Sequence, residues 1–335
     1  TMIIAEIGVN HNGSIYKAKK LIDCAKSSGA DFVKFQYYKT DELTVKDASK
    51  APYQVRKKNK KAESQYDMLK KYELSESDLI ILYKYALSKK INFMLSFFSE
   101  SCLSILKKIN CEYIKIPSGE NDNYSLLKKI ANQKKKVIFS TGMSNLDQIK
   151  KSFKVISKKI SKNRIILLHC ISSYPTHIEN INLNSISLLK NIFNTKVGLS
   201  DHTSDTSIPS YAIANQATVI EKHLTYSNKA SGPDHKSSLN PKNFKIMTNK
   251  IRHIEKLLGS NNIFISKEEK ININYVRKSY YYKNNYKLGT KINLDSVKLL
   301  RPRKFINPGD EIIFKNKLLK RNVKKNQPVD IKDFK

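Results

Sequence analysis

Eight short, apolar, β-rich runs recur along the chain, and segments with helical periodicity separate them. The runs are apolar almost throughout, which is typical of parallel strands that are buried on both faces. Strand and helix alternating eight times predict an α/β protein with a closed (β/α)8 TIM barrel. The expected strands are Ile3–Gly8, Asp31–Gln36, Ile91–Phe98, Tyr113–Gly119, Lys136–Thr141, Arg164–Cys170, Lys196–Asp201 and Thr218–Thr225.

The segments between these runs carry apolar residues at the spacing of an amphipathic helix. In the first segment this spacing runs from Ala18 to Ala25, and Gly29 is placed to end the helix. One connection, Lys39–Tyr72, lies in an interval too long for a single helix, and we interpret it as an insertion on the active-site side. The remaining expected helices are Ser77–Lys89, Ser101–Ile109, Tyr124–Ala131, Leu146–Ile160, Leu183–Phe193, Ser207–Ala217 and Pro241–Leu258.

The formal net charge is +33 over 335 residues, which makes nucleic acid a candidate partner. The lysines are spread along the whole chain, however, and the basic runs lack interleaved aromatic residues that could stack on bases. We therefore expect a solvated lysine-rich surface that attracts small anions, and no nucleic-acid partner. No apolar run approaches the roughly 20 residues that span a bilayer, so we also expect no membrane partner.

The cysteine pattern and the first residues of the chain bear on the compartment. The four cysteines form no CxxC pair and lie in apolar contexts, which predicts reduced thiols in a cytoplasmic protein. The apolar stretch near the start has no basic region before it and no cleavage pattern, so we expect no signal peptide.

Polar side chains gather where the predicted strands end. Since the carboxyl ends of the strands form the mouth of a (β/α)8 barrel, we expect these side chains to line one pocket. They are Glu6, Lys34, Gln36, Ser96, Lys115, Ser118, Glu120, Ser140, Thr141, His169, Ser172, Tyr174, Ser200, Asp201, His202, Glu221, Lys222 and His223.

Two histidines, His202 and His223, end neighbouring strands. Two imidazoles can hold a divalent metal and leave coordination positions for water and a substrate oxygen, and such a metal could polarise a carbonyl. The alternative is that each ring satisfies a hydrogen bond of the core. Because the two lie on adjacent strands, we favour the metal site.

Two lysines, Lys34 and Lys115, lie in otherwise apolar strands, where an unpaired charge is costly. With the hydroxyls of Ser96, Ser118, Ser140 and Ser200 around them, they could cradle a phosphate and a carboxylate. Internal salt bridges, for example to Glu6 and Glu120, are one alternative. A Schiff-base lysine is another.

Three carboxylates are candidates for proton transfer or for binding substrate hydroxyls. Glu6 and Glu120 lie in or beside predicted strands, and Asp234 lies in the polar loop "SGPDHKSSL" near the mouth. For Asp234, simple turn chemistry is an equal alternative.

Eight motifs, in order along the chain, together resemble the sialic acid synthase family. They are "IIAEIGVNHNGS", "DFVKFQ", "YIKIPSGE", "STGMS", "LLHCISSYPT", "VGLSDHT", "VIEKHLT" and "SGPDHKSSL". The resemblance implies a transferase that condenses phosphoenolpyruvate with the open aldehyde form of an N-acetylated mannose-type sugar and water. The product would be a nine-carbon nonulosonic acid, and phosphate would leave by C–O cleavage.

The resemblance also implies roles for individual residues. A divalent metal, typically manganese, with magnesium or cobalt as alternatives, would be held by His202 and His223. Glu6 would lie near the attacking water. Glu120 and Asp234 would hold the sugar, and Tyr174 would line its site. The phosphoenolpyruvate contacts would be Lys34, Ser96, Lys115, Ser118, Ser140 and Ser200.

Beyond the barrel, the resemblance predicts a linker over residues 259–275 and a small antifreeze-like (SAF) domain over 276–335, after a catalytic domain of residues 1–258. In that family the small domain reaches across a homodimer and places an arginine over the partner's sugar site, and Arg301 matches it. The alternative for Arg301 is one more surface charge in a basic tail.

The run "SGPDHKSSL" favours the neuraminate and legionaminate branch over the pseudaminate branch. The sequence leaves open whether the sugar is N-acetylmannosamine or 2,4-diacetamido-2,4,6-trideoxymannose. A pseudaminate synthase stays as an alternative within the same class. Two alternatives come from other classes: a basic nucleic-acid-binding protein and an inactive barrel that acts as a scaffold.

Overall fold

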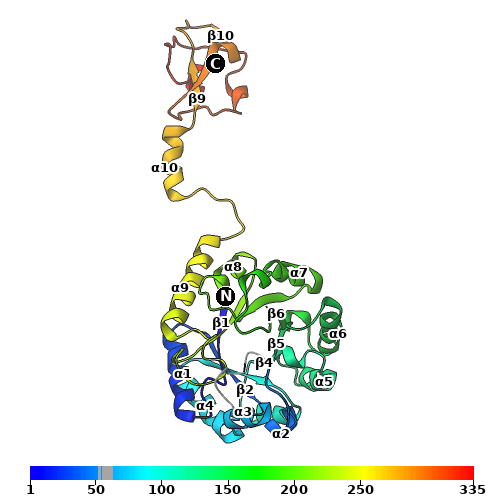
Figure 1. Cartoon of the computed structure of the whole chain (residues 1–335). Helices are drawn as coiled ribbons and strands as arrows, with labels where there is room; N and C mark the ends of the chain where they lie inside the picture. The colour runs from blue at the N-terminus through cyan, green and yellow to red at the C-terminus, as the bar shows by residue number, and fades with distance from the viewer. Residues whose placement is uncertain (52–53, 55–62) are drawn as a thin grey trace. The chain divides into compact units, whose positions relative to one another are not determined.

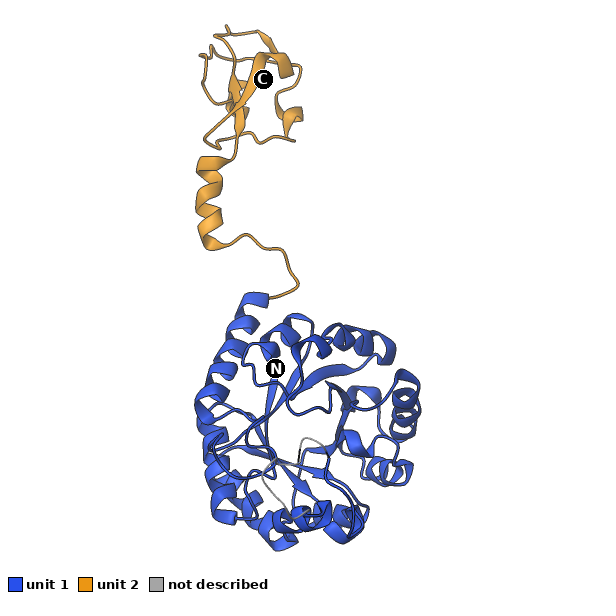
Figure 2. Cartoon of the chain, viewed as in Figure 1, with its two compact units in different colours: residues 1–259 blue, residues 260–335 orange. Residues whose placement is uncertain are grey.

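The computed structural model of the chain describes residues 1–51, 54 and 63–335. It divides into two compact units, Thr1–Gly259 and Ser260–Lys335, which Figure 2 colours separately.

The first unit is a closed barrel of eight parallel strands, so the predicted (β/α)8 architecture is confirmed. Each strand pairs with the next in the chain, and β1 pairs with β8 to close the sheet (Figure 1). The strands are β1 (Met2–Gly8), β2 (Phe32–Tyr37), β3 (Asn92–Phe97), β4 (Tyr113–Ile116), β5 (Lys136–Ser140), β6 (Ile165–Cys170), β7 (Lys196–Asp201) and β8 (Val219–His223).

Strand β4 is shorter than the predicted Tyr113–Gly119. It ends at Ile116 because Pro117, which has no backbone N–H, follows and the chain turns into the 3-10 helix η3 (Ser118–Glu120). The other strands lie within two residues of their predicted bounds.

Helices fill the connections, as the apolar periodicity predicts. In α1 the Ser14 side chain accepts a hydrogen bond from the Lys17 N–H, and Gly29 follows the helix at φ +86°, the left-handed region that glycine favours. The helices of the barrel unit are α1 (Ile15–Ser27), α2 (Thr40–Leu43), α3 (Gln65–Tyr72), α4 (Glu76–Ser88), α5 (Tyr124–Asn132), α6 (Leu146–Ser157), α7 (Asn184–Phe193), α8 (Ile208–Ala214) and α9 (Pro241–Leu258), with 3-10 helices η2 (Ser101–Lys107), η4 (Lys162–Arg164) and η5 (Ile178–Asn180).

One predicted α-helix, Ser101–Ile109, is wrong, because the segment forms the 3-10 helix η2. Its apolar residues Cys102, Ile105, Leu106 and Ile109 do follow the i, i+3, i+4, i+7 spacing of an amphipathic helix, so the spacing did not distinguish a 3-10 helix from an α-helix.

The predicted insertion Lys39–Tyr72 contributes α2 and α3. Leu43, Ala51, Gln54, Gln65 and Leu69 of this segment line a cavity together with the strand ends, so the insertion lies on the mouth side. Residues 52–53 and 55–62 of the insertion lie outside the described residues.

Seven of the strands send an apolar side chain into the barrel, and we call these residues the floor layer. They form a cluster separate from the apolar layer between strands and helices. The remaining strand, β7, supplies Gly198 in place of an apolar side chain. An added Cβ at this glycine would lie 2.2 Å from the Val219 carbonyl oxygen and 2.8 Å from the Leu168 side chain. The floor layer consists of Ile4, Phe32, Met94, Tyr113, Ile138, Leu168 and Val219.

The second unit is small and rich in short strands. β9 (Ser279–Tyr282) pairs antiparallel with β11 (Val297–Leu300), and β10 (Lys291–Ile292) pairs with β12 (Lys317–Leu318). Its own apolar core is built around Tyr282 and Phe314. The unit also contains α10 (Lys267–Val276) and the 3-10 helices η6 (Leu294–Ser296), η7 (Glu311–Ile313) and η8 (Ile331–Asp333).

Among the described residues, the helices are too short or too polar to cross a bilayer.

Candidate active site

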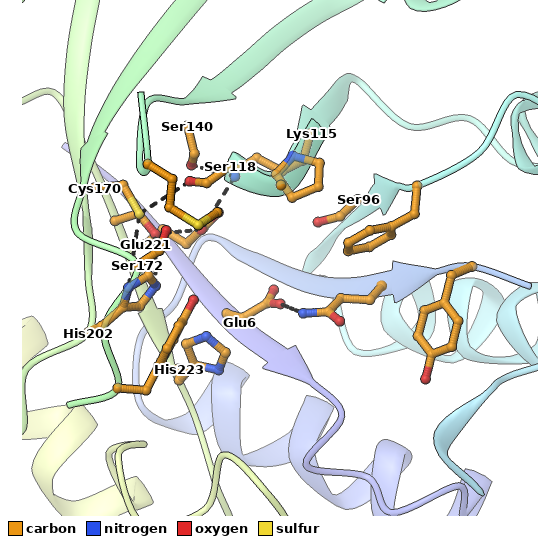
Figure 3. Close-up of a pocket in the computed structure, with 18 of the residues that line it drawn as sticks. Glu6, Ser96, Lys115, Ser118, Ser140, Cys170, Ser172, His202, Glu221 and His223 are labelled. Carbon is orange, nitrogen blue, oxygen red and sulfur yellow. Dashed lines mark hydrogen bonds and ion pairs between the residues drawn. The ribbon is translucent and has the colours of Figure 1, made fainter. Parts of the chain in front are cut away.

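A cavity of about 420 Å³ opens at the carboxyl ends of the barrel strands. Most of the predicted site residues line it, and Figure 3 shows them converging from separate strands. The predicted residues that the cavity brings together are Glu6, Lys34, Gln36, Ser96, Lys115, Ser118, Ser140, Ser172, Tyr174, Ser200, His202, Glu221 and His223.

The alternation of side chains along a strand explains this convergence. Residues i and i+2 of a strand point to the same face, so the residue two positions after each floor position also points into the barrel. These residues form a lower tier, and all of them line the cavity. The lower tier consists of Glu6, Lys34, Ser96, Lys115, Ser140, Cys170, Ser200 and Glu221.

The residues two positions after those of the lower tier form an upper tier. The upper tier contains both histidines, one directly after β7 and one at the end of β8, together with other residues that line the cavity. Its members that line the cavity are Gln36, Phe98, Pro117, Ser172, His202 and His223. The two tiers give the cavity a deep end and an outer end.

The two lysines lie in the lower tier and are fully buried. The Lys34 ammonium lies 2.9 Å from Glu6 Oε2, 3.4 Å from Glu221 Oε2 and 3.0 Å from the Ser96 hydroxyl. The Lys115 ammonium donates to the Ser140 hydroxyl at 2.6 Å and lies 3.7 Å from Glu221 Oε1. The predicted convergence of ammonium groups and hydroxyls is therefore present in the structure.

Glu221 bridges the two lysines, and sequence reasoning missed this role. Its carboxylate lies between the ammonium groups and accepts a hydrogen bond from the Ser200 hydroxyl at 2.9 Å. Burial alone would raise the pKa of Glu221. The charges of Lys115 and Lys34 outweigh this effect and lower the pKa to about 2, so the group is ionised. The signal was available, because Glu221 shares the face of His223 two positions later.

Of the two salt bridges considered as an alternative, the one from a lysine to Glu6 is present, while the described residues show none to Glu120. The Glu120 carboxylate instead accepts a hydrogen bond from Asn123 Nδ2 at 2.7 Å. Burial raises the pKa of Glu120, and Asn123 opposes this rise. Glu120 is not among the residues that line the cavity.

Glu6 occupies the lower tier beside both Lys34 and Gln36. Its Oε1 accepts a hydrogen bond from Gln36 Nε2 at 2.9 Å. Burial, together with the charge of Glu221, raises its pKa, and Lys34 opposes the rise. A carboxylate with a raised pKa is a stronger base than an exposed one, as proton transfer near neutral pH requires.

The two histidines face one another across the outer end of the cavity, with ring centroids 5.6 Å apart. His202 Nδ1 lies 2.7 Å from the Ile171 carbonyl oxygen, so a proton on Nδ1 leaves the Nε2 lone pair available. Tyr174 packs against the ring of His202, with 4.1 Å between centroids. This contact fixes the orientation of the imidazole.

These residues fit a divalent metal. His223 Nδ1 is buried without a hydrogen-bond partner, although Asp234 Oδ2 lies 3.9 Å away. Burial and the charges of His202 and Lys34 lower the pKa of His223 well below its usual value, which keeps this imidazole neutral as a metal ligand must be. Burial alone would also lower the pKa of His202, but Cys170 and the Ile171 carbonyl outweigh this effect and raise it, so His202 would give up a proton on binding a metal. Clusters of three or more ligand residues are absent from the described part of the chain, so two imidazoles would share the metal with water and substrate.

Asp234 lies outside the cavity lining. The side chain of Asp234 approaches His223, and burial and Glu6 raise its pKa to about 6. Arg301 is exposed and belongs to the second unit.

Cys170 is a lower-tier residue that we did not predict for the site. Its thiol lies 4.0 Å from His202 Nδ1 and 3.5 Å from the Ser118 hydroxyl. Burial raises the pKa of this thiol, but His202 and Ser118 lower it to about 7. All four cysteines are free, as predicted.

Comparison with known proteins gives a consistent result. The model of the NeuB family matches residues 21–263. The chain is 41% identical to the N,N'-diacetyllegionaminic acid synthase of Campylobacter jejuni, over 98% of each chain. It is 39% identical to the Legionella pneumophila protein of the same name, over 92% of this chain and 87% of that one.

A solved structure agrees. The crystal structure of the N-acetylneuraminic acid synthetase from Leptospira borgpetersenii, in complex with citrate, superposes with a TM-score of 0.72 at 32% identity. The match covers 81% of this chain and 90% of that one. The closed barrel, the two-tier cavity and these matches agree: the chain belongs to the NeuB family of sialic acid synthases.

Proposed function

We propose that the protein condenses phosphoenolpyruvate with 2,4-diacetamido-2,4,6-trideoxymannose and water to give N,N'-diacetyllegionaminate and phosphate. The observation that carries the proposal is the convergence of two buried ammonium groups and several serine hydroxyls beside two facing histidines. Two relatives named as diacetyllegionaminic acid synthases, alike over nearly the whole chain, support this sugar over N-acetylmannosamine. Four unpaired thiols support a reducing, cytoplasmic setting.

The lower tier suits phosphoenolpyruvate. Lys34 and Lys115 each carry a positive charge at the deep end of the cavity, and their partners Ser96 and Ser140 are hydroxyls that can turn toward a ligand. Charge-assisted hydrogen bonds from ammonium groups to phosphate or carboxylate oxygens are strong, especially where water is excluded. The same groups would stabilise the negative charge on the departing phosphate.

The upper tier suits the sugar. His202 and His223 would hold a divalent metal, manganese in our proposal, with magnesium or cobalt as alternatives. When bound, such a metal polarises the aldehyde oxygen and makes its carbon more electrophilic. Tyr174 would line the sugar site, and Glu120 and Asp234 would hold sugar hydroxyls from the loops beyond the cavity.

Glu6 would handle the proton of water. After C3 of phosphoenolpyruvate bonds to the aldehyde carbon, C2 is left electron-poor, and a water oxygen adds there. Glu6 lies in the lower tier with a raised pKa, so its carboxylate can accept the proton that this water gives up. The C2–O bond to phosphate then breaks, and Lys34 and Lys115 hold the leaving phosphate.

The second unit would complete the site in a homodimer. We propose that residues 276–335 are the antifreeze-like SAF domain, carried by a linker over residues 259–275 after a catalytic domain of residues 1–258. Arg301 would contact the sugar bound by the partner subunit. Mixing Arg301→Ala chains with His202→Ala chains tests this: restored activity is expected, and no rescue would contradict the arrangement.

The central test is direct. Purified protein is incubated with phosphoenolpyruvate, Mn²⁺ and each candidate sugar, and phosphate release and product mass are followed. Phosphate and a product of legionaminate mass are expected with the diacetamido sugar. Turnover with the pseudaminate precursor alone would assign the chain to that branch, and no phosphate with any sugar would overturn the proposal.

The bond that breaks is tested with isotope. Phosphoenolpyruvate carrying ¹⁸O at the bridging position should transfer the label to the released phosphate, because C–O cleavage leaves that oxygen on phosphorus. Label that stays in the sugar product would instead show P–O cleavage and would rule out the addition of water at C2.

A further inference from the structure

A buried ion pair lies directly behind the two histidines. Asp201 precedes His202, and Lys222 precedes His223 along the chain. The two residues are paired in the register of β7 and β8, and both alternate with side chains that point into the barrel. They therefore face the helix layer, on the opposite side of the sheet from the cavity.

The ammonium of Lys222 is surrounded by oxygen atoms of one short segment. It lies 2.6 Å from Asp201 Oδ2, 2.6 Å from the Thr203 carbonyl oxygen and 3.4 Å from the Asp205 carbonyl oxygen. Asp201 in turn accepts the Thr203 N–H at 2.8 Å. Because His202 lies inside this segment, the contacts join the backbone on both sides of His202 to the strand that carries His223.

Stability alone does not account for this arrangement. Lys222 is 1% exposed and Asp201 3%, so both charges have lost their water. A buried ion pair of this kind is often no more stabilising than two apolar side chains of similar volume. Apolar side chains could not fix the orientation of the backbone around His202. The Lys222 ammonium can, because it contacts several acceptors of this segment at fixed positions.

We propose that Lys222 and Asp201 are positioning residues that set the separation and orientation of His202 and His223. The inference rests on the proposed function only for the identity of the ligand that the rings hold. Residues behind a metal ligand that fix its orientation commonly change metal affinity by 10- to 100-fold when they are replaced.

The test uses the full-length protein and a variant built to keep its fold. Lys222→Met with Asp201→Leu replaces the ion pair by two apolar side chains. Binding of Mn²⁺ is followed by the electron paramagnetic resonance signal of the free ion, and unfolding is followed by circular dichroism. We expect a folded variant that binds Mn²⁺ about tenfold more weakly. Unchanged affinity in the folded variant would overturn the proposal.

A second measurement needs no metal. In protein labelled with ¹⁵N in the histidine rings, the peaks of His202 and His223, assigned from single His→Asn variants, should shift in the double variant. The other histidine peaks should stay in place. If the ring peaks of both residues remain unchanged, the proposal is overturned. If the parent protein does not bind Mn²⁺, that result counts only against the proposed metal, and the ring peaks still test the positioning role.

Two further variants complete the design. Asp201→Asn keeps the shape of the side chain and removes its charge. This variant takes the place of the double variant in both measurements if the double variant does not fold. It should move the same two peaks by a smaller amount, and peaks that stay in place would contradict the proposal. Arg252→Met breaks an ion pair to Asp31, ahead of β2 at the other end of the strands, and should leave both readouts unchanged.

Discussion

Among the described residues of the barrel unit, three lysines are buried, and they differ in which face of the sheet they occupy. Lys34 and Lys115 point into the cavity, where their partners are carboxylates and hydroxyls of side chains that also line it. Lys222 points to the helix layer and is held by Asp201 and by backbone oxygens. The inward lysines are accessible to a ligand, and the outward lysine serves the structure. Burial of a charge alone does not tell these two cases apart.

The largest effect should come from an inward lysine. Lys115→Met removes one ammonium group from the cavity, while Lys34 remains beside Glu221 to balance its charge. We expect kcat/KM for phosphoenolpyruvate to fall about 10³-fold, as for the loss of a group that stabilises developing charge. Circular dichroism should show an intact fold. A fall of less than tenfold would remove Lys115 from the proposed cradle.

The outward lysine should affect the stability of the fold in addition to its proposed effect on the two histidine rings. Lys222→Met leaves the Asp201 carboxylate buried without its ammonium partner, which typically costs about 3–5 kcal/mol of unfolding free energy. Denaturant unfolding measures the loss, and Lys222→Met with Asp201→Leu should recover most of it. If Lys222→Met were as stable as the parent, the structural role of this lysine would be wrong.

Acid should weaken the bridge between the inward lysines. The folded-state pKa of Glu221 is about 2, against an ordinary value of 4.5, so ionised Glu221 stabilises the fold above pH 4.5. That contribution, on the order of 3 kcal/mol from the pKa difference, is lost as the pH falls from 4.5 to 2. The unfolding free energies of the parent and Glu221→Gln should converge over this range. A constant difference would contradict the assigned pKa.

The smallest effects should come from the carboxylates beyond the cavity lining. Glu120→Gln and Asp234→Asn should each raise KM for the sugar about tenfold, the size expected for one hydrogen bond to a charged group. KM for phosphoenolpyruvate should not change, because the lower tier is untouched. A change in the phosphoenolpyruvate KM alone would place these groups with the lysines.

Much of this fold could be predicted from the sequence because strand burial leaves a direct pattern. Eight apolar runs gave eight strands, and polar residues at their ends gave most of the cavity. The failed helix at Ser101–Ile109 shows the limit, since a segment with the apolar spacing of an amphipathic helix formed a 3-10 helix instead of an α-helix.

The features of the site that were missed divide into two kinds. The bridging role of Glu221 and the position of Cys170 were within reach of sequence reasoning, because the period of two along a strand places each residue two positions after a floor residue. The surroundings of Glu120 were not, because whether its carboxylate turns to Asn123 or into the cavity depends on loop geometry after Pro117.

The floor layer has a consequence for how ligands enter and leave the cavity. Side chains from seven strands plug the barrel beneath the lower tier, and the close approach of Leu168 and Val219 fills the place left open by Gly198. A ligand would therefore enter the cavity at its outer end, where His202 and His223 lie. A ligand that occupies the lower tier would have to bind before a ligand of the upper tier and dissociate after it, so the shape of the cavity favours an ordered mechanism.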